Sequence, residues 1–388
     1  MPDGFDPATI ESRIRSFESF GIHRTGWPGD DQTSAWLAAE LQAAGVAASI
    51  ERFTFPRIEH RAATLRWPDG ETTGVPLYDA GATPRGGFDG ALAAPDDDDL
   101  FGRIVVATAG DEDFAGPAIY DRLDALQAAG VIAVALVSGD EDGAVVLRNA
   151  ERIDRPHTLP VLQLARNATQ TLISAVFIGA EATIEIDAER LDSTATNVVA
   201  TLPGEDPDAA PVGVITPKSG WFGCAAERGG GLAIWLALAE AFSNTPHRRP
   251  LEFVASSGHE IHHYGLRAYL RTRPQIAAGA VAWLHLGASI GAKRPLPRMA
   301  ASDQQLHDLA VAAFEAAGSD ERESLPLGTP GGGEAREIDA AGGRYLSLLG
   351  GHPLFHSPND STDRAVDAES VARHARAALQ IVEGMLEL

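Results

Sequence analysis

The sequence predicts an α/β protein: a three-layer α/β/α sandwich that is interrupted by an inserted, β-rich domain. Outside the insert, strand-like apolar runs alternate with amphipathic helical patterns. Between residues 60 and 192, short strand-like runs alternate instead with turns rich in proline and glycine. We therefore predict one α/β domain formed by residues 1–59 and 193–388, with the insert at 60–192.

Two amphipathic helices and a strand are predicted before the insert. In the first helix, at 6–20, apolar residues recur at helical spacing. The second helix, at 32–44, is closed by Gly45, because glycine readily adopts the left-handed conformation that ends many helices. A strand at 46–55 follows.

The insert is predicted to contain two buried strands on either side of a helix. The strands are expected at 102–107 and 130–137, and the helix at 118–129. An alternating pattern at 182–186 predicts a further strand. The acidic run at 96–99 is most simply a solvated loop.

After the insert, strands and helices alternate to the end of the chain. The first of these strands, at 196–203, has the pattern of an edge strand. The other elements predicted in this part are strands at 212–215, 280–286 and 344–349, and helices at 232–242, 303–317 and 368–388.

The stretch 251–270, LEFVASSGHEIHHYGLRAYL, predicts a buried strand that turns into a helix. Its histidines and Glu260 lie where the strand ends, and ligands bind at the carboxyl ends of strands in open α/β sheets. His259 and His263 also have the HExxH spacing of zinc enzymes, which requires one continuous helix through both residues. Because a strand and a turn run into His259, we do not predict that motif.

The composition excludes several classes of partner. The net charge of −23 argues against nucleic acid and anionic membranes. Cys224 is the only cysteine, so no disulfide framework or thiolate metal cluster is expected. No apolar run suggests a signal peptide or a membrane span, so we expect a cytoplasmic protein. Arginine far outnumbers lysine, which indicates a GC-rich bacterial genome and makes Lys218 informative, since Lys293 is the only other lysine.

Three motifs resemble the co-catalytic zinc aminopeptidase family, which includes aminopeptidase Y, aminopeptidase S, glutamate carboxypeptidase II, glutaminyl cyclase and the transferrin receptor. They are TATNVVATLPG at 194–204, the G-x-E-x-x-x-x-G-x-R-A-Y turn at 258–269 and HSPNDS at 356–361. The insert is similar to a protease-associated (PA) domain, through a GxIVV strand, a helix, an AxGAxAV-like strand and a later LPV. The resemblance implies a zinc-exopeptidase fold with a PA-like insert.

The resemblance also implies a two-zinc site, but most of its ligand positions carry other residues. Glu260 and His356 keep the family's ligand types, and His259 stands in the place of the general base. The other ligand positions hold Thr216, Lys218, Ala225 and His285. We therefore predict that the two-zinc site is absent. Because an ammonium beside a dication is unfavourable, we expect Lys218 to occupy the vacated position and to pair with Glu260.

Three functions remain open. In the first, Glu260, His285 and His356 bind one divalent ion, with zinc expected. His259 would take a proton from the bound water, and an amide bond of a small substrate would be hydrolysed. In the second, no metal is bound: Lys218 or Arg228 stabilises developing negative charge, and a His259–Glu260 acid–base pair supports lyase, isomerase or acyl-transfer chemistry. In the third, the protein is a non-catalytic binding relative.

We expect a peptidase-like hydrolase with at most one metal ion, acting on a small molecule, and not an ordinary dinuclear aminopeptidase. Neither nucleic acid nor a membrane is an expected partner, and a homodimer is an open alternative. The residues expected to contact the substrate are Trp221, Glu227, Arg228, His263 and His352.

Overall fold

The structure is a computed structural model that describes residues 3–114, 116–294, 297–319 and 323–388. It divides into two compact units. The main unit contains Met1–Thr54 and Thr194–Leu388, and the second unit contains Phe55–Ser193. The sequence-based division placed these boundaries at residues 60 and 192.

A mixed sheet forms the centre of the main unit. Its strands are β1 (Ala48–Trp67), β8 (Glu181–Leu202), β9 (Val212–Pro217), β10 (Leu251–Ser256), β11 (Trp283–Leu286), β12 (Arg298–Ala301), β13 (Glu323–Ser324) and β14 (Tyr345–Leu349). The order is β13-β12-β14-β11-β9-β10-β8, and β1 pairs with β8. Strands β14, β11, β9 and β10 are parallel to their neighbours in that series. The predicted edge strand at 196–203 instead lies inside the sheet as part of β8, because β10 and β1 both pair with this strand.

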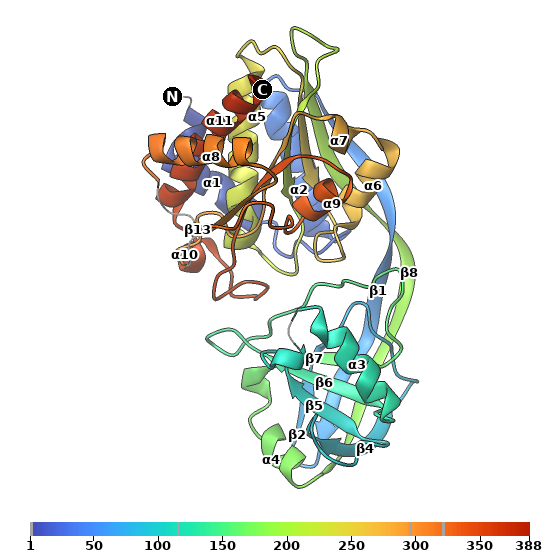
Figure 1. Cartoon of the computed structure of the whole chain (residues 1–388). Coiled ribbons are helices and arrows are strands. Elements are labelled where there is room, and N and C mark those ends of the chain that lie inside the picture. The colour runs from blue at the N-terminus through green and yellow to red at the C-terminus, as the bar shows by residue number, and fades with distance from the viewer. Residues whose placement is uncertain (1–2, 115, 295–296, 320–322) are drawn as a thin grey trace. The chain divides into compact units, whose positions relative to one another are not determined.

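Helices cover both faces of this sheet, so the predicted three-layer sandwich is confirmed (Figure 1). Side chains alternate between the two layers along the strands, as Val214 and Ile215 do on β9. One face packs against α1 (Pro7–Glu18), α2 (Pro28–Ala43), α5 (Gly230–Ser243), α8 (Gln304–Ala316) and α11 (Ala368–Leu386), and the other against α6 (Tyr264–Thr272), α7 (Ile276–Gly279) and α9 (Ala335–Ala340).

Helix α2 begins four residues before its predicted start. Pro28 occupies the first turn, where its fixed φ suits a helix and its missing N–H is not needed. Asp30 and Asp31 also lie in the first turn, where the helix dipole favours negative charge. This early start carries Asp30 into the buried interior, where it becomes part of the site described below.

The second unit is β-rich, as predicted for the insert. Strands β4 to β7 form a parallel series, with β3 antiparallel to β7 at one end and β8 antiparallel to β4 at the other. Apolar clusters lie on both sides of this sheet. Its elements are β2 (Gly70–Thr73), β3 (Val75–Pro76), β4 (Phe88–Ala93), β5 (Ile104–Thr108), β6 (Ala133–Ser138), β7 (Val161–Ala165), α3 (Ala118–Ala128) and α4 (Leu172–Phe177). Its likeness to a PA domain remains a prediction.

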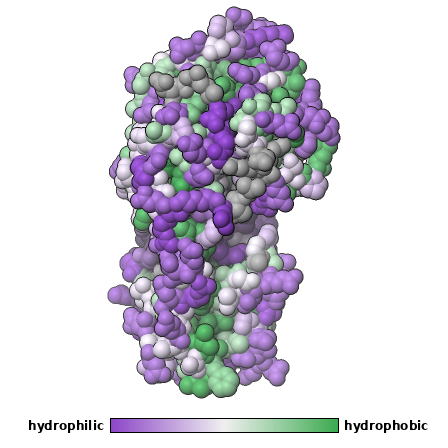
Figure 2. Space-filling view, turned by 90° about the vertical axis from the view of Figure 1, so that its left-hand side faces the viewer, coloured by the Kyte–Doolittle hydropathy of each residue, from purple (hydrophilic) through white to green (hydrophobic). Residues whose placement is uncertain are grey.

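Short helical turns complete the chain. They are η1 (Asp3–Phe5), η2 (Glu112–Phe114), η3 (Arg166–Ala168), η4 (Ala225–Gly229) and α10 (Thr362–Ala365). The face of the molecule shown in Figure 2 is largely hydrophilic, in keeping with the many charged residues of the sequence. Among the described residues, none of the helices combines the length and apolar character that crossing a membrane requires.

Candidate functional site

The polar residues singled out in the sequence gather at the carboxyl ends of the parallel strands in the main unit. Lys218 follows β9, His259 and Glu260 follow β10, and His285 lies near the end of β11. Glu334 reaches the same region from the N-cap position of α9. The site thus has the position that open α/β sheets favour for ligands.

A tight turn separates β10 from α6. Gly258 has φ +80, and a Cβ there would lie 2.8 Å from the backbone nitrogen of Gly265, so the turn requires glycine. Helix α6 begins only at Tyr264, and His262 and His263 before it both have left-handed backbone conformations, with φ 62 and 51. His259 and His263 therefore do not share a helix, and the HExxH interpretation is excluded as expected.

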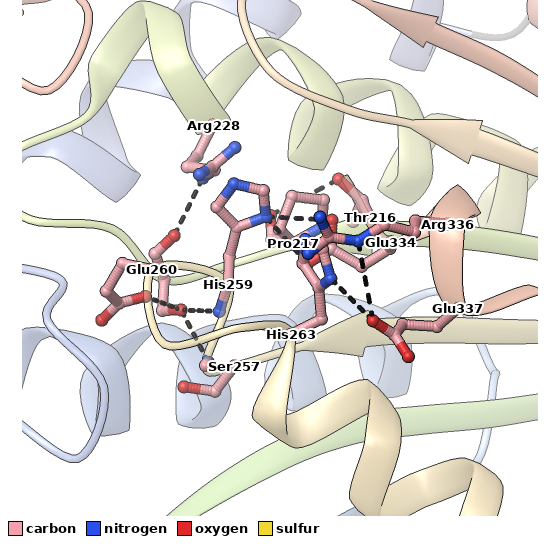
Figure 3. A network of polar contacts seen from close by, with 12 residues as sticks. Thr216, Pro217, Arg228, Ser257, His259, Glu260, His263, Glu334, Arg336 and Glu337 are labelled. Carbon is pink, nitrogen blue, oxygen red and sulfur yellow. Dashed lines mark hydrogen bonds and ion pairs between the residues drawn. The ribbon is translucent and has the colours of Figure 1, made fainter. Parts of the chain in front are cut away.

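Three imidazoles surround the carboxylate of Glu334. The Nδ1 atom of His259 lies 3.0 Å from each Glu334 oxygen (Figure 3). Nε2 of His285 lies 3.4 Å from Oε2 of the same carboxylate. Single ligand atoms of His259, His263 and Glu334 all lie within 4.8 Å of one another, and all three residues are buried. We call Glu334, His259, His263 and His285 the Glu334 cluster.

The charges within the Glu334 cluster stabilise one another. Burial opposes the ionisation of Glu334, but attraction to His259, the hydrogen bonds from His259 and the nearby imidazole of His285 hold the pKa of its carboxyl well below the ordinary value. Burial also lowers the pKa of His263, although Glu337 accepts a hydrogen bond from its Nδ1 over 3.1 Å. The cluster is therefore an anionic carboxylate faced by imidazoles, a set of donors suited to one metal ion.

A second buried group lies on η4. Glu227 Oε1 and Arg228 Nη2 form an ion pair of 2.7 Å, and Nε2 of His356 lies 3.5 Å from the same Glu227 oxygen. The Asp360 carboxylate accepts hydrogen bonds from the backbone of Ala226 and Glu227, over 2.9 and 3.0 Å, which holds η4 in place. Burial opposes ionisation of Glu227, but Arg228 and the surrounding histidines keep the pKa of its carboxyl below the ordinary value.

Lys218 pairs with Asp30 and not with Glu260, so that expectation is wrong. Its Nζ forms an ion pair with the Asp30 carboxylate and lies 3.1 Å from the Asp30 carbonyl oxygen. Asp30 also accepts hydrogen bonds from Ser257 Oγ and the Gly26 backbone, over 2.8 and 3.0 Å. Lys218 and Asp30 are both fully buried, because the early start of α2 brings Asp30 to the end of β9. The positive charge of Lys218 is therefore balanced by Asp30, a residue of the N-terminal segment.

Glu260 is also occupied by protein donors. Thr25 donates from its backbone nitrogen and its hydroxyl to Oε1, over 2.6 and 2.7 Å, and Ser219 donates to Oε2 over 2.7 Å. Burial raises the pKa of the Glu260 carboxyl, although these hydrogen bonds oppose the rise. Glu260 thus fastens the segment around Thr25 to the turn after β10, and the predicted His259–Glu260 acid–base pair is replaced by His259 with Glu334.

The predicted metal ligands Glu260, His285 and His356 do not form one group among the described residues. Glu260 is held by Thr25 and Ser219, His285 lies against Glu334, and His356 lies against Glu227. The group with the geometry of a metal site consists of His259, His263 and Glu334 instead.

The remaining predicted contacts with substrate lie around the second group. Trp221 is buried beneath the Arg24 guanidinium, which lies 5.1 Å from the centre of its ring. His352 Nδ1 lies 2.9 Å from Ser289 Oγ, and its Nε2 lies 3.4 Å from the Asp360 carboxylate. The contact of Trp221 with substrate stays a prediction, and His352 adjoins Asp360, which binds the backbone of Glu227.

Glu334, Glu337 and Asp30 were missed by the sequence analysis. A signal for Glu334 exists in the three glycines before it, since a run of glycines allows close backbone approach. Gly333 has φ +57, and a Cβ there would lie 3.0 Å from Cε1 of His285. The backbone thus passes directly against the imidazoles and delivers Glu334 to them.

Backbone conformations also mark this region. Five described residues other than glycine have positive φ. Each such conformation costs of order 1–3 kcal/mol and is frequent at functional sites. The five are Cys224, His262, His263, Ser289 and His356.

Comparison with known proteins supports the fold. The sequence matches no protein-family model and no curated protein. The structure is similar to a zinc aminopeptidase from Bacillus subtilis, with a TM-score of 0.81 and 17% identity over 97% of this chain and 94% of the other. It is also similar to a peptidase M28 precursor from Shewanella amazonensis SB2B, with a TM-score of 0.76 and 19% identity over 97% and 92%. An aminopeptidase from Aneurinibacillus sp. strain AM-1 gives a TM-score of 0.71 and 17% identity over 97% and 93%.

These identities establish the fold alone. The chain has a co-catalytic zinc aminopeptidase-type fold, which confirms the zinc-exopeptidase architecture predicted from the sequence.

Proposed function

We propose that this protein is a peptidase-like hydrolase that cleaves an amide bond in a small substrate at the Glu334 cluster. The observation that carries the proposal is the convergence of His259, His263 and Glu334 on one buried point. The similarity of the fold to zinc aminopeptidases supports the same class of reaction. In this proposal the centre holds at most one divalent ion.

The donor set fits a single zinc ion. Two imidazoles and one carboxylate form a recognised catalytic zinc set, in which a fourth position stays open for water or substrate. A zinc ion held by His259, His263 and Glu334 would supply Lewis-acid polarisation of the amide carbonyl and a water of lowered pKa. Among the described residues this is the one group with metal-binding geometry, and Lys218 and Asp30 form an ion pair at the end of β9.

Neighbouring residues orient two imidazoles of the Glu334 cluster, those of His263 and His285. Glu337 accepts a hydrogen bond from Nδ1 of His263, which leaves Nε2 as the nitrogen of that ring that can bind a metal ion. The Ser347 hydroxyl lies 2.8 Å from Nδ1 of His285, so the Nε2 atom faces Glu334. These contacts fix ring orientations before any ligand arrives, as catalytic geometry requires.

A metal-free enzyme is the second candidate, and one specific contact favours it. His259 Nδ1 is bonded to both oxygens of Glu334, which is the arrangement of a carboxylate that orients a catalytic imidazole. In this alternative Nε2 of His259 exchanges a proton with substrate. Of the two cations considered for the stabilisation of negative charge, Arg228 is favoured, because Lys218 is paired with Asp30. Lyase, isomerase or acyl-transfer chemistry would then be accessible.

Turnover of aminoacyl and acyl amides, with and without a chelator, separates these candidates. We expect hydrolysis that the chelator abolishes and that added zinc restores. Turnover that resists the chelator would support the metal-free enzyme, and the absence of turnover across the panel would favour a binding protein. The variant His262→Ala serves as a control for His259→Ala, since His262 is a neighbour outside the group of converging ligand atoms.

A further inference from the structure

The buried pair Glu227–Arg228 has unused hydrogen-bonding capacity. Both side chains are only 1% exposed. Apart from their ion-pair contacts, neither the two Glu227 oxygens nor the two Nη atoms of Arg228 have a hydrogen-bond partner among the described residues. Buried polar groups are nearly always bonded, so such a concentration of unbonded donors and acceptors calls for an explanation.

The pair is held rigidly by its surroundings. Arg228 Nε donates to the Ser219 carbonyl oxygen over 2.8 Å, which fixes the plane of the guanidinium. The Asp360 carboxylate binds the backbone N–H of Glu227, which fixes the other partner. A guanidinium anchored through Nε still offers the rest of its planar fork for a carboxylate.

The pair also adjoins the proposed reaction centre. Ser219 connects the two, because its carbonyl oxygen accepts a hydrogen bond from Arg228 and its hydroxyl accepts one from the backbone nitrogen of His259 over 3.2 Å. His356 touches Glu227 and, like His259, is 8% exposed. Two residues that adjoin the pair, directly or through Ser219, therefore retain some contact with solvent.

We propose that Glu227 and Arg228 form a recognition subsite for an N-acyl amino acid, or for the C-terminal residue of a peptide. Arg228 would bind the α-carboxylate through Nη1, the Nη atom that is not paired with Glu227, and Oε2 of Glu227 would accept the N–H of the amide that is cleaved. A guanidinium donor beside a carboxylate acceptor matches this ligand, because in an N-acyl amino acid the carboxylate and the amide N–H are attached to the same α-carbon. This inference rests on the proposed amide hydrolysis and adds the class of substrate to it.

Binding measurements test the subsite without requiring turnover. The probes are N-acetyl amino acids with apolar, acidic and basic side chains, each paired with its N-acetyl amino acid carboxamide, and affinity is measured by calorimetry on the full chain. For the preferred side chain we expect the carboxylate to bind roughly 10- to 100-fold more tightly than its carboxamide, which is the usual contribution of a hydrogen bond to a charged group.

Variants locate the effect. The double variant Glu227→Gln/Arg228→Met removes both charges and so avoids leaving one buried charge unpaired; we expect it to lose the preference for carboxylate. Arg228→Lys, which keeps the charge but lacks the planar fork, should retain only part of the preference and covers the case in which the double variant does not fold. Arg248→Met, at an arginine whose side chain is 69% exposed, is the control and should bind like the wild type.

The inference is overturned if no pair of probes shows a preference for carboxylate, or if the preference survives undiminished in the folded double variant or in Arg228→Lys. Its failure is distinguishable from failure of the proposed function. Hydrolysis of carboxamides and carboxylates at equal efficiency would retain the reaction and remove the subsite. Selective carboxylate binding without any hydrolysis would retain the subsite and remove the reaction.

Discussion

Replacing Lys218 by methionine should destabilise the main unit strongly. The substitution removes an ammonium that is fully buried against Asp30, which is itself fully buried. Asp30 would keep its hydrogen bonds from Ser257 and Gly26 but would lose its counter-charge. Leaving one partner of a buried pair uncompensated costs about 3–5 kcal/mol, and the two remaining donors place this case at about 3 kcal/mol.

Thermal and urea unfolding at pH 7 measure this cost. For a unit of this size a loss of about 3 kcal/mol corresponds to roughly 6–12 °C in Tm. Lys218→Met/Asp30→Asn should be more stable than Lys218→Met alone, because it removes both charges and the partners are directly coupled. Lys293→Met is the matched control: Lys293 donates to the Asp363 carbonyl oxygen in an exposed position, so its replacement should change stability by no more than about 0.5 kcal/mol.

Two results would refute this reasoning. One is a Lys218→Met protein as stable as Lys293→Met, which would mean that Asp30 does not depend on the ammonium. The other is a double variant no more stable than the single variant, which would mean that packing of the lysine stem, and not its charge, is what Lys218 contributes.

Three further predictions concern single residues. His259→Ala should lower turnover by about 10²-fold or more in steady-state assays, as loss of a ligand or of a proton-transfer group would, and unchanged turnover would contradict both enzymatic candidates. Burial raises the pKa of the Glu260 carboxyl, so this group keeps its proton to higher pH in the native state than in the unfolded state. The free energy of unfolding should therefore fall as pH rises above about 4.5. Glu260→Gln should remove this fall in urea titrations across pH, and an unchanged pH dependence would show that Glu260 is not its source. Asp303 accepts a hydrogen bond from the backbone of Leu306 at the start of α8, and two from the Arg344 guanidinium over 2.9 and 3.0 Å. Asp303→Ala should therefore lower the free energy of unfolding by about 1–2 kcal/mol, measured by thermal unfolding. An unchanged stability would show that neither contact stabilises the helix. Arg344 lowers the pKa of Asp303, so this contribution should be present above pH 4 and lost as pH falls through the lowered pKa.

The layers of the fold were predictable because they depend on local periodicity. Apolar alternation on β9 and helical spacing in α11 each reveal an element without knowledge of its neighbours. The edge pattern at 196–203 misled because it reports the side chains of one segment, whereas the place of a strand in a sheet depends on its partners. Here β1, more than 100 residues earlier in the chain, covers that edge.

The site was predictable as a region but not as a set of contacts. The strand and turn at 251–259 placed His259 correctly at a strand end, since this depends on one continuous stretch. Lys218 pairs with Asp30 and Glu260 with Thr25, which lie 188 and 235 positions away, and no local pattern relates them. Glu334 was missed for the same reason, because its role arises only when the glycine run before α9 is packed against His285.

Metal content per chain, measured by mass spectrometry on protein purified without added metal or a histidine tag, tests the Glu334 cluster most directly. The proposal predicts about one zinc ion per chain in the wild type, which is the capacity of a single three-donor site. It further predicts loss of this ion in Glu334→Gln and retention in Glu260→Gln, since the Glu260 oxygens are taken by Thr25 and Ser219. An ion that stays in Glu334→Gln but disappears in Glu260→Gln, or a wild type with about two ions, would contradict the assignment of the centre to Glu334.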